Sequence, residues 1–153
     1  MLRIGLISDT HGLVRPEALE ALAGVDRVLH AGDVGRREVL DALARIAPVL
    51  AVRGNVDHGP WAAGLPSSVT LDLGGVRIHV LHILEDLDLD PVAAGVGVVV
   101  YGHSHVPSIE TRAGVLYVNP GSAGPRRFHL PTTIAELTID GARPLVRSVA
   151  LLR

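Results

Sequence analysis

The sequence predicts an α/β fold in which two β-sheets pack face to face, with helices on the outside. Up to about residue 60, apolar strands alternate with short amphipathic helices, a pattern typical of a parallel sheet with crossover helices. Beyond residue 68, short strands separated by Gly-containing turns indicate hairpins and a second sheet. Only four of the 153 residues are aromatic, so the core must consist of aliphatic side chains. We expect a single domain over residues 1–153, because the chain is too short for two ordinary ones.

The first half of the chain is expected to contain three strands and two helices. The strands cover residues 2–7, 25–31 and 49–52, and the helices cover residues 16–23 and 36–45. Pro16 suits the first turn of a helix, and Gly24 suits the position just after its end. Val39, Leu40 and Leu43 recur at helical spacing and give the second helix an apolar face.

The second half is rich in strands. They are expected over residues 68–73, 76–81, 96–101, 108–112, 115–118, 132–139 and 143–150. The first two flank Gly74 and Gly75, which form the two-residue turn of a hairpin. Residues 96–101 are a continuous apolar run, as in a central strand buried on both faces. Residues 83–95 are expected to form a loop with one or two helical turns.

Five of the predicted strands are followed directly by side chains that can bind a metal. These side chains are Asp9, His11, Asp33, Asn55, His82, His103 and His105. In an extended segment, residues i and i+2 point to the same side, so Asp9 and His11 can converge on one cation. Ligands of open α/β sheets bind beyond the carboxyl ends of the strands. Seven donors are too many for one cation and suit two.

The chemistry of these donors narrows the choice of metal. The chain has no Cys, so any metal must be held by nitrogen and oxygen. Imidazole and carboxylate together suit Mn, Ni, Fe, Co or Zn. A pair of cations needs a carboxylate shared between them, and Asp33 is the natural choice, because its position after Gly32 in a tight turn is expected to leave both of its oxygens free. Asn55 adds a neutral carbonyl oxygen.

Composition and charge exclude several classes of function. The net charge is −2, and no run of basic residues is long enough to bind a nucleic-acid duplex or an anionic membrane. All fourteen basic residues are Arg, which excludes chemistry by a nucleophilic Lys. The sequence shows neither a signal peptide nor an apolar run that could span a membrane, so we expect a cytoplasmic protein. Whether it forms a homo-oligomer is left open.

Five short motifs follow one another along the chain, namely Asp9-x-His11, Gly32-Asp33, Gly54-Asn55-x-Asp57, the strand-terminal His82 and Gly102-His103-x-His105. In this order they resemble the calcineurin-like metallophosphoesterase superfamily. The short length, with Asn119-Pro120-Gly121-Ser122 and Pro125-Arg126, is similar to the small YfcE-like phosphodiesterase branch. The resemblance covers most of the chain and implies a four-layer α/β/β/α sandwich of two mixed β-sheets flanked by helices.

The resemblance also implies a metal-dependent phosphoesterase, in the first place a phosphodiesterase that hydrolyses a small phosphoester. Two divalent ions, with Mn among the candidates, would be bound by two sets of ligands. The sets are Asp9, His11, Asp33 and His105 for one ion, and Asp33, Asn55, His82 and His103 for the other. A water or hydroxide that bridges the two ions would be the nucleophile, and Asp33, Asn55 and His103 would be catalytic residues.

A second class of function stays open. A retromer subunit that resembles this superfamily is a scaffold that binds partner proteins, and the present chain could be a non-catalytic scaffold of the same fold. All seven ligand positions are retained here. This favours the enzyme, because a scaffold has no need to keep so many desolvated polar groups.

Two positions depart from the superfamily pattern. Val56 stands where many members have a His that contacts the phosphate and donates a proton to the leaving group. The sequence therefore does not identify the group that protonates the leaving group. The YfcE-like branch lacks this His as well. Ile83 follows His82 at a position where Gly is usual. Its branched side chain lies next to the proposed ligand His82 and bears on whether the second metal has room there.

Other polar residues near the motifs are expected to play supporting parts. Asp57 should orient the turn that precedes it, and His30, inside an apolar strand, should support the ligands rather than bind metal. His58 and Arg126 are candidates for contact with the phosphate or the leaving group. His79 points to the opposite face of its strand from the donor that ends it and is expected to be a surface or packing residue rather than a ligand.

Overall fold

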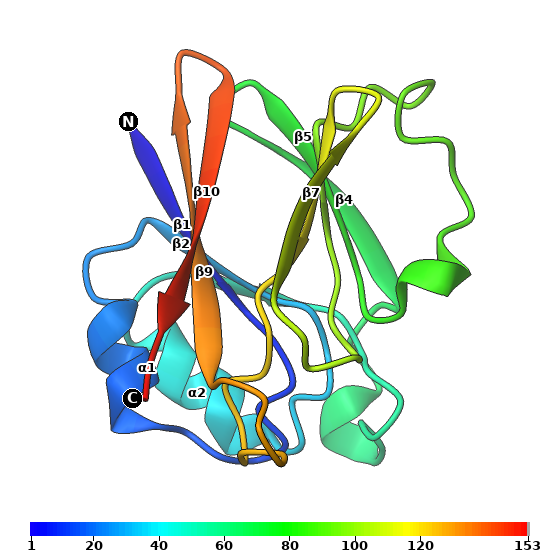
Figure 1. Cartoon of the computed structure of the whole chain (residues 1–153). Coiled ribbons are helices and arrows are strands. Elements are labelled where there is room, and N and C mark those ends of the chain that lie inside the picture. Colours follow the sequence, from blue (N-terminus) through cyan, green and yellow to red (C-terminus); the bar gives the residue numbers. More distant parts are fainter. Residues whose placement is uncertain (153) are drawn as a thin grey trace.

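Two five-stranded sheets form the body of the protein in the computed structural model, which describes residues 1–152 (Figure 1). The first sheet contains, in spatial order, β10 (Arg143–Ala150), β9 (Thr133–Asp140), β1 (Leu2–Ile7), β2 (Arg27–His30) and β3 (Val49–Ala51). The second contains β4 (Ser68–Leu73), β5 (Val76–Leu81), β6 (Val98–Val100), β8 (Val115–Asn119) and β7 (Ser108–Arg112). Both sheets mix parallel and antiparallel pairs, as the family resemblance implied.

Each sheet has three neighbouring parallel strands. In the first sheet β1 pairs with β2 and β2 with β3, and in the second β5 pairs with β6 and β6 with β8. Antiparallel strands complete the sheets, with β9 and β10 on the first and β4 and β7 on the second. Parallel neighbours end at the same edge of a sheet, so the loops that follow them are brought together.

Aliphatic side chains fill the space between the two sheets. Ile4 and Leu6 of β1 and Leu29 of β2 belong to one buried cluster with Ile78 and Val80 of β5. Full burial of such a side chain contributes about 1.5–3 kcal/mol. Within the described part of the chain, the buried members of this cluster include no aromatic residue. The predicted aliphatic core is therefore confirmed.

Both α-helices cover the outer face of the first sheet. They are α1 (Pro16–Ala21) and α2 (Arg37–Ala44), which lie side by side in Figure 1. Val39 and Leu43 are the buried residues of α2 and join a second apolar cluster between this helix and the sheet. Within residues 1–152, no helix combines the length and the apolar character needed to cross a membrane.

The outer face of the second sheet has a thinner cover. The short 3₁₀-helix η2 (Leu84–Asp86) and the irregular chain after it place Leu87 and Leu89 against Leu81 and Val99 of the sheet. The α/β/β/α order is confirmed, and its fourth layer consists of one helical turn and irregular chain. This agrees with the loop and short helical segment predicted for residues 83–95.

The predicted elements differ from the observed ones mainly at their ends. The second strand, predicted over residues 25–31, is shortened to Arg27–His30. The predicted hairpin turn joins β4 and β5 at Gly74 and Gly75, whose φ angles of 59° and 83° suit glycine. The 3₁₀-helix η1 (Pro60–Ala62) is not predicted, because three residues are too few to show a periodic pattern.

Candidate metal centre

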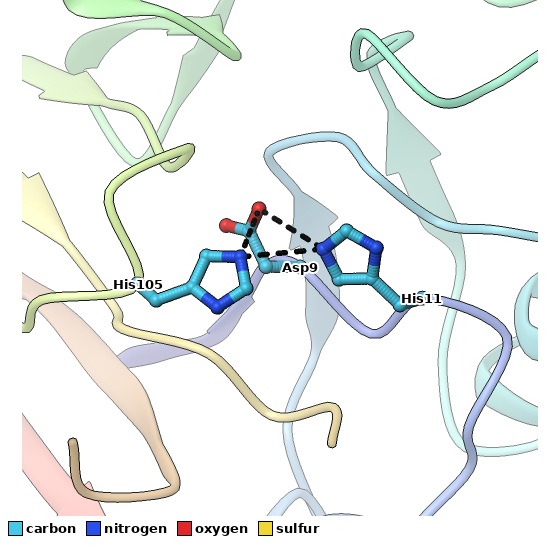
Figure 2. Close-up of side chains that lie close together, drawn as sticks. All are labelled: Asp9, His11 and His105. Atoms are coloured by element: carbon cyan, nitrogen blue, oxygen red, sulfur yellow. Dashed lines mark hydrogen bonds and ion pairs between the residues drawn. The ribbon is translucent and has the colours of Figure 1, made fainter. Parts of the chain in front are cut away.

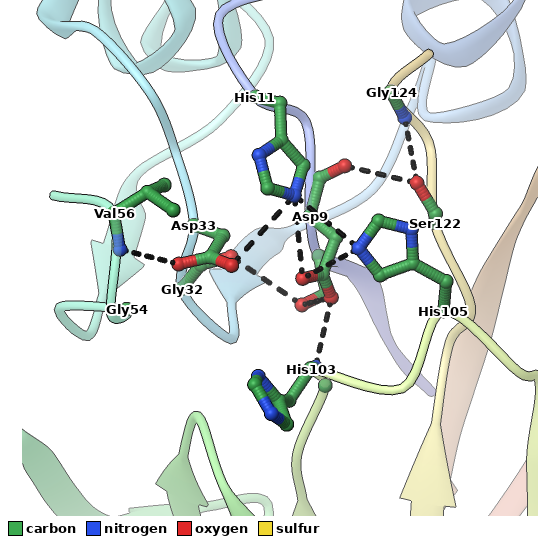
Figure 3. A network of polar contacts seen from close by, with 12 residues as sticks. Asp9, His11, Gly32, Asp33, Gly54, Val56, His103, His105, Ser122 and Gly124 are labelled. Atoms are coloured by element: carbon green, nitrogen blue, oxygen red, sulfur yellow. Dashed lines mark hydrogen bonds and ion pairs between the residues drawn. The ribbon is translucent and has the colours of Figure 1, made fainter. Parts of the chain in front are cut away.

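The loops that follow β1, β2, β3, β5 and β6 bring their side chains into contact with one another. Figure 3 shows residues of the loops after β1, β2, β3 and β6. The seven predicted metal donors all lie on these loops or strand ends. Six of them form two groups, each with its ligand atoms within 4.8 Å of one another: Asp9, His11 and His105, and Asp33, His82 and His103. Asn55 adjoins the second group through its amide oxygen. The structure therefore brings donors from about a hundred positions of sequence together in one region.

The first group surrounds one oxygen of Asp9 (Figure 2). Asp9 Oδ1 lies 3.3 Å from His105 Nε2 and 3.8 Å from His11 Nε2, and the two ring nitrogens are 3.3 Å apart. This oxygen is buried and has no hydrogen-bond partner among the described residues. A buried carboxylate oxygen without a partner is costly. A cation between the oxygen and the two imidazoles would remove that cost.

The second group is arranged around His82. Its Nδ1 donates to the carbonyl oxygen of Ala31 at 2.8 Å, so Nε2 carries the lone pair when the ring is neutral. Nε2 lies 3.2 Å from Asp33 Oδ2 and 2.9 Å from Asn55 Oδ1. Nδ1 of His103 is 3.2 Å from the same amide oxygen. Acceptor atoms thus face one another across a short gap, which favours a cation or a proton between them.

The ionisable groups respond to this crowding. Burial lowers the pKa of His82, but the carboxylate of Asp33 and the carbonyl of Ala31 outweigh it and raise the pKa above its ordinary value. Burial raises the pKa of Asp33, but the contacts to His82 and to the N–H of Val56 outweigh it and lower the pKa to about 2. A proton on His82 can therefore stabilise the carboxylate at the place where a cation would do the same.

Asp33 lies between the two groups. Its Oδ2 is 3.2 Å from His82 Nε2 and 3.6 Å from His11 Nε2, one nitrogen from each group. Its Oδ1 accepts a hydrogen bond from the backbone N–H of Val56 at 3.0 Å. One oxygen therefore fixes the carboxylate, and the other faces both groups, as a ligand shared by two cations must do.

The side-chain amide of Asn55 fits this site in two orientations. With its oxygen inward, it faces His82 and His103 as a metal ligand would. Turned by half a rotation, its NH₂ group would donate to the two carboxylate oxygens of Asp33 at 3.3 and 3.2 Å. The first orientation suits a cation among these groups, and the second suits direct hydrogen bonding between the side chains.

Five of the seven donors have a backbone conformation that residues other than glycine rarely adopt. The φ angle is 54° at Asp9, 47° at His11, 55° at Asp33, 75° at His103 and 65° at His105. A left-handed conformation costs about 1–2 kcal/mol per residue and persists where surrounding contacts hold it. Backbone strain is thus concentrated at the donors.

Asp57 connects the loops that follow β2 and β3. Its buried carboxylate accepts hydrogen bonds from the backbone N–H groups of Val34, Gly35 and Gly54, at 3.2, 2.9 and 2.8 Å. A carboxylate that accepts several backbone N–H bonds holds their loops in fixed positions. Asp57 therefore orients the turns on both sides of the second donor group, which is the role predicted for it.

Two serines hold Asp9 in place. Ser8 Oγ donates to Asp9 Oδ2 at 2.7 Å, and Ser122 Oγ donates to the carbonyl oxygen of Asp9 at 3.0 Å (Figure 3). The backbone N–H of His103 donates to the same Oδ2 at 3.1 Å. Sequence analysis does not assign these roles, because a serine that bonds to a distant loop carries no local signal.

His30 is fully buried and supports two of the loops. Its Nδ1 accepts from the backbone N–H of Gly32 at 3.1 Å, so its Nε2 donates to Thr10 Oγ1 at 3.0 Å. Thr10 in turn donates to the carbonyl oxygen of Val34. Burial lowers the pKa of His30 to about 3, so the ring stays neutral near neutral pH.

The buried His30 should make the protein less stable as the pH falls below about 6.5. The unfolded state then takes up a proton that the folded state does not bind, and the free energy of unfolding falls by about 1.4 kcal/mol per pH unit. His30→Gln should remove this part of the pH dependence. Urea unfolding between pH 7 and pH 5 tests it, with His129→Gln in an exposed loop as the control. If the free energy of unfolding changed with pH equally in wild type and in His30→Gln, the expectation would be contradicted.

Three other positions singled out in the sequence are not among the donors. The side chains of His58 and Arg126 are exposed and make no hydrogen bond or ion pair within residues 1–152. Ile83 helps to line a cavity next to the second group, and His82 keeps its place among the donors. The wall of that cavity also includes Asp86 and Asp88, which follow β5 in the chain.

Comparison with known proteins decides the family. A model described as the calcineurin-like phosphoesterase superfamily domain matches residues 2–142. The chain belongs to this superfamily. A probable metallophosphoesterase of Methanocaldococcus jannaschii is 36% identical over 150 residues, which cover 90% of this chain and 76% of the relative. The phosphodiesterase YfcE of Escherichia coli is 30% identical over 166 aligned positions, and the match covers 92% of this chain and 89% of the relative.

The fold of this calcineurin-like phosphoesterase also has a counterpart among solved structures. Vps29 of Chaetomium thermophilum matches it with a TM-score of 0.80 and 21% identity, over 98% of each chain. That identity shows a shared fold and nothing more. The predicted family, with its resemblance to YfcE, is confirmed by the family model and the two curated relatives.

Proposed function

We propose that this calcineurin-like phosphoesterase is a metal-dependent phosphodiesterase that uses two divalent cations to hydrolyse a small phosphoester. The observation that carries the proposal is the position of Asp33 Oδ2, which lies 3.6 Å from His11 Nε2 and 3.2 Å from His82 Nε2. An oxygen in this position can serve two cations at once. The name of the 30% identical relative, a phosphodiesterase, supports the reaction class.

The donor set fits such a pair of cations. The first would be held by Asp9, His11, Asp33 and His105, and the second by Asp33, Asn55, His82 and His103. All the ligand atoms are nitrogen or oxygen, which suits Mn, Ni, Fe, Co or Zn. Two such cations, when bound, lower the pKa of a water held between them and neutralise charge on the phosphate oxygens.

The protein's own contribution is to hold these atoms in place. Asp9 and Asp33 each use one oxygen to accept hydrogen bonds from the chain, which aims the other oxygen at the site. His82 is fixed in the same way by its hydrogen bond to a backbone carbonyl. Asn55 and His103 are exposed, so a phosphate oxygen can reach them from solvent. We assign these two residues, with Asp33, to the reacting centre.

The residue after Asn55 limits the range of good substrates. Val56 has an apolar side chain, and its backbone N–H is already used by Asp33. It can donate no proton to the alcohol that leaves. Esters whose alcohol is a weak base, or is protonated by water, should therefore react fastest.

Hydrolysis of bis(4-nitrophenyl) phosphate tests the proposed function. Protein stripped of metal with a chelator should be inactive, and added Mn²⁺ or Ni²⁺ should restore turnover by more than about 100-fold, because both cations act directly on the reacting groups. Zinc and cobalt serve as further additions. Metal-loaded protein that remains inert would contradict the enzyme and favour the protein-binding scaffold.

A further inference from the structure

A cavity of about 340 Å³ lies directly beside the second donor group. Asn55 and His82 form part of its wall, so a molecule bound at the donors has access to it. Its size falls within the range of about 300–1,000 Å³ typical of small-molecule sites. We call it the arm pocket and define it by the polar residues that complete its wall: Arg53, Ser67, Ser68, His79, Asp86 and Asp88.

The charges of the arm pocket are predominantly negative. Asp86 and Asp88 are exposed, and their carboxylates make no hydrogen bond or ion pair within the described chain. Arg53 supplies the single guanidinium of the wall. The two carboxylates are acceptors for hydroxyl groups and repel an anion. The hydroxyls of Ser67 and Ser68 add neutral hydrogen-bonding groups.

His79 places a polar imidazole ring in the wall of the arm pocket. It is only 4% exposed, and its Nδ1 is 2.7 Å from Thr70 Oγ1 on the neighbouring strand. That contact fixes the ring. Among the residues that the structure describes, Nε2 has no hydrogen-bond partner, yet it is not one of the buried atoms sealed from solvent. The ring therefore keeps one nitrogen for a molecule in the pocket.

We propose that the arm pocket binds an organic arm of the phosphoester, and that it selects a neutral arm with hydroxyl groups, such as a sugar, over an arm with a second phosphate. The proposal rests on the proposed function, because the donors must hold the phosphate for an arm to enter the pocket. Hydroxyl groups match the carboxylates, serines and imidazole of the wall. A second phosphate would instead lie near two carboxylates that face only one guanidinium, that of Arg53.

Three nitrophenyl esters with the same leaving group test the proposal. They are methyl 4-nitrophenyl phosphate, thymidine 5′-(4-nitrophenyl phosphate), and the 3′-phosphate of the latter. With metal-loaded wild type, kcat/KM for the thymidine ester should exceed those for the other two by about tenfold or more, since only its arm both fills the pocket and lacks a second phosphate. We then compare kcat/KM for the 3′-phosphorylated thymidine ester with kcat/KM for the unphosphorylated thymidine ester. The double variant Asp86→Asn, Asp88→Asn should raise the ratio of these two values by about tenfold.

Glu85→Gln is the matched control, because Glu85 is an exposed acid next to Asp86 that does not line the pocket. It should leave the ratio unchanged. His79→Phe, which keeps a ring but removes Nε2, should raise KM for the thymidine ester more than for the methyl ester. Since His79 is buried and this variant could misfold, the exposed pair of aspartates carries the test.

Metal content, measured by mass spectrometry, supplies a readout besides activity. It should be equal in wild type, Glu85→Gln and the double Asn variant. Loss of metal from the double variant would overturn the proposal, since it would place Asp86 and Asp88 at the cations. Equal kcat/KM for the three esters, or a ratio that the double variant does not change, would also overturn it while leaving the proposed function intact. Failure to hydrolyse any of the three would instead defeat the proposed function.

Discussion

Asp33→Asn should lower the turnover of a phosphodiester by more than about 100-fold, beyond the loss typical of residues that only support a metal ligand. Oδ2 of Asp33 faces His11 and His82 at once, so the substitution weakens both cation sites. Asn keeps the shape of the side chain, and its amide oxygen can still accept from the N–H of Val56. The substitution therefore removes the negative charge of Asp33 and keeps the hydrogen bond that holds the loop.

The measurement is kcat with bis(4-nitrophenyl) phosphate and saturating Mn²⁺, together with the number of metal ions bound per chain. Fewer than two ions should remain in Asp33→Asn, and the far-ultraviolet circular dichroism spectrum should match that of wild type. Asp41→Asn is the control, because Asp41 lies on the exposed side of α2 and, among residues 1–152, pairs with Arg37 alone. Full activity of Asp33→Asn would rule out a mechanism with two cations that share this carboxylate.

The position of the candidate site could be predicted because the residues that indicate it are close together in the sequence. Each donor follows an apolar strand within a few residues, so the end of the strand can be read from the same short stretch that contains the donor. Parallel strands then bring such ends together whatever the rest of the sequence. Asp9, Asp33 and His82 lie together in the structure for this reason.

Other features of the site depend on contacts between distant segments and have no local signal. Asp33 was expected to present a free carboxylate, but one oxygen is taken by the N–H of Val56, 23 residues away. His79 was expected to be a surface or packing residue, and it is buried, but it also lines a cavity whose wall includes Asp86 and Asp88 from η2 and the chain that follows. Periodicity reports which face of a strand a residue occupies and not what covers that face.

Backbone strain at the donors is also beyond a sequence pattern. Asp, His and Asn adopt left-handed backbone conformations more readily than most other residues, but most Asp, His and Asn residues in proteins have other conformations. Their presence in a sequence therefore does not predict a left-handed backbone. At His11 and His103, φ is positive because the loop must turn sharply while its side chain stays aimed at the pocket. The glycines next to the donors are the clearest sign in the sequence that these loops pack closely against one another. Substitution of one of these glycines tests that packing.

Gly54→Ala should lower the free energy of unfolding by more than about 3 kcal/mol, in the range of core mutations that force the backbone to move. A Cβ atom at this position would collide with the backbone nitrogen and with Oδ1 of Asp33. Neither can yield cheaply, because the nitrogen is main chain and Oδ1 is held by Val56. The N–H of Gly54 also donates to Asp57, so a shift of this loop loosens the contact that connects β2 and β3.

Urea unfolding of the metal-free protein gives the stability, and titration with Mn²⁺ gives the affinity of the centre. Both should fall in Gly54→Ala, because the collision displaces Asp33 from between the two donor groups. Gly64→Ala is the matched control, since a Cβ there meets no atom within 4 Å, and its stability should stay within about 0.5 kcal/mol of wild type. A Gly54→Ala protein as stable as Gly64→Ala would show that the loops after β2 and β3 are not packed against each other. The position assigned to Asp33, and the two-cation site with it, would then have to be abandoned.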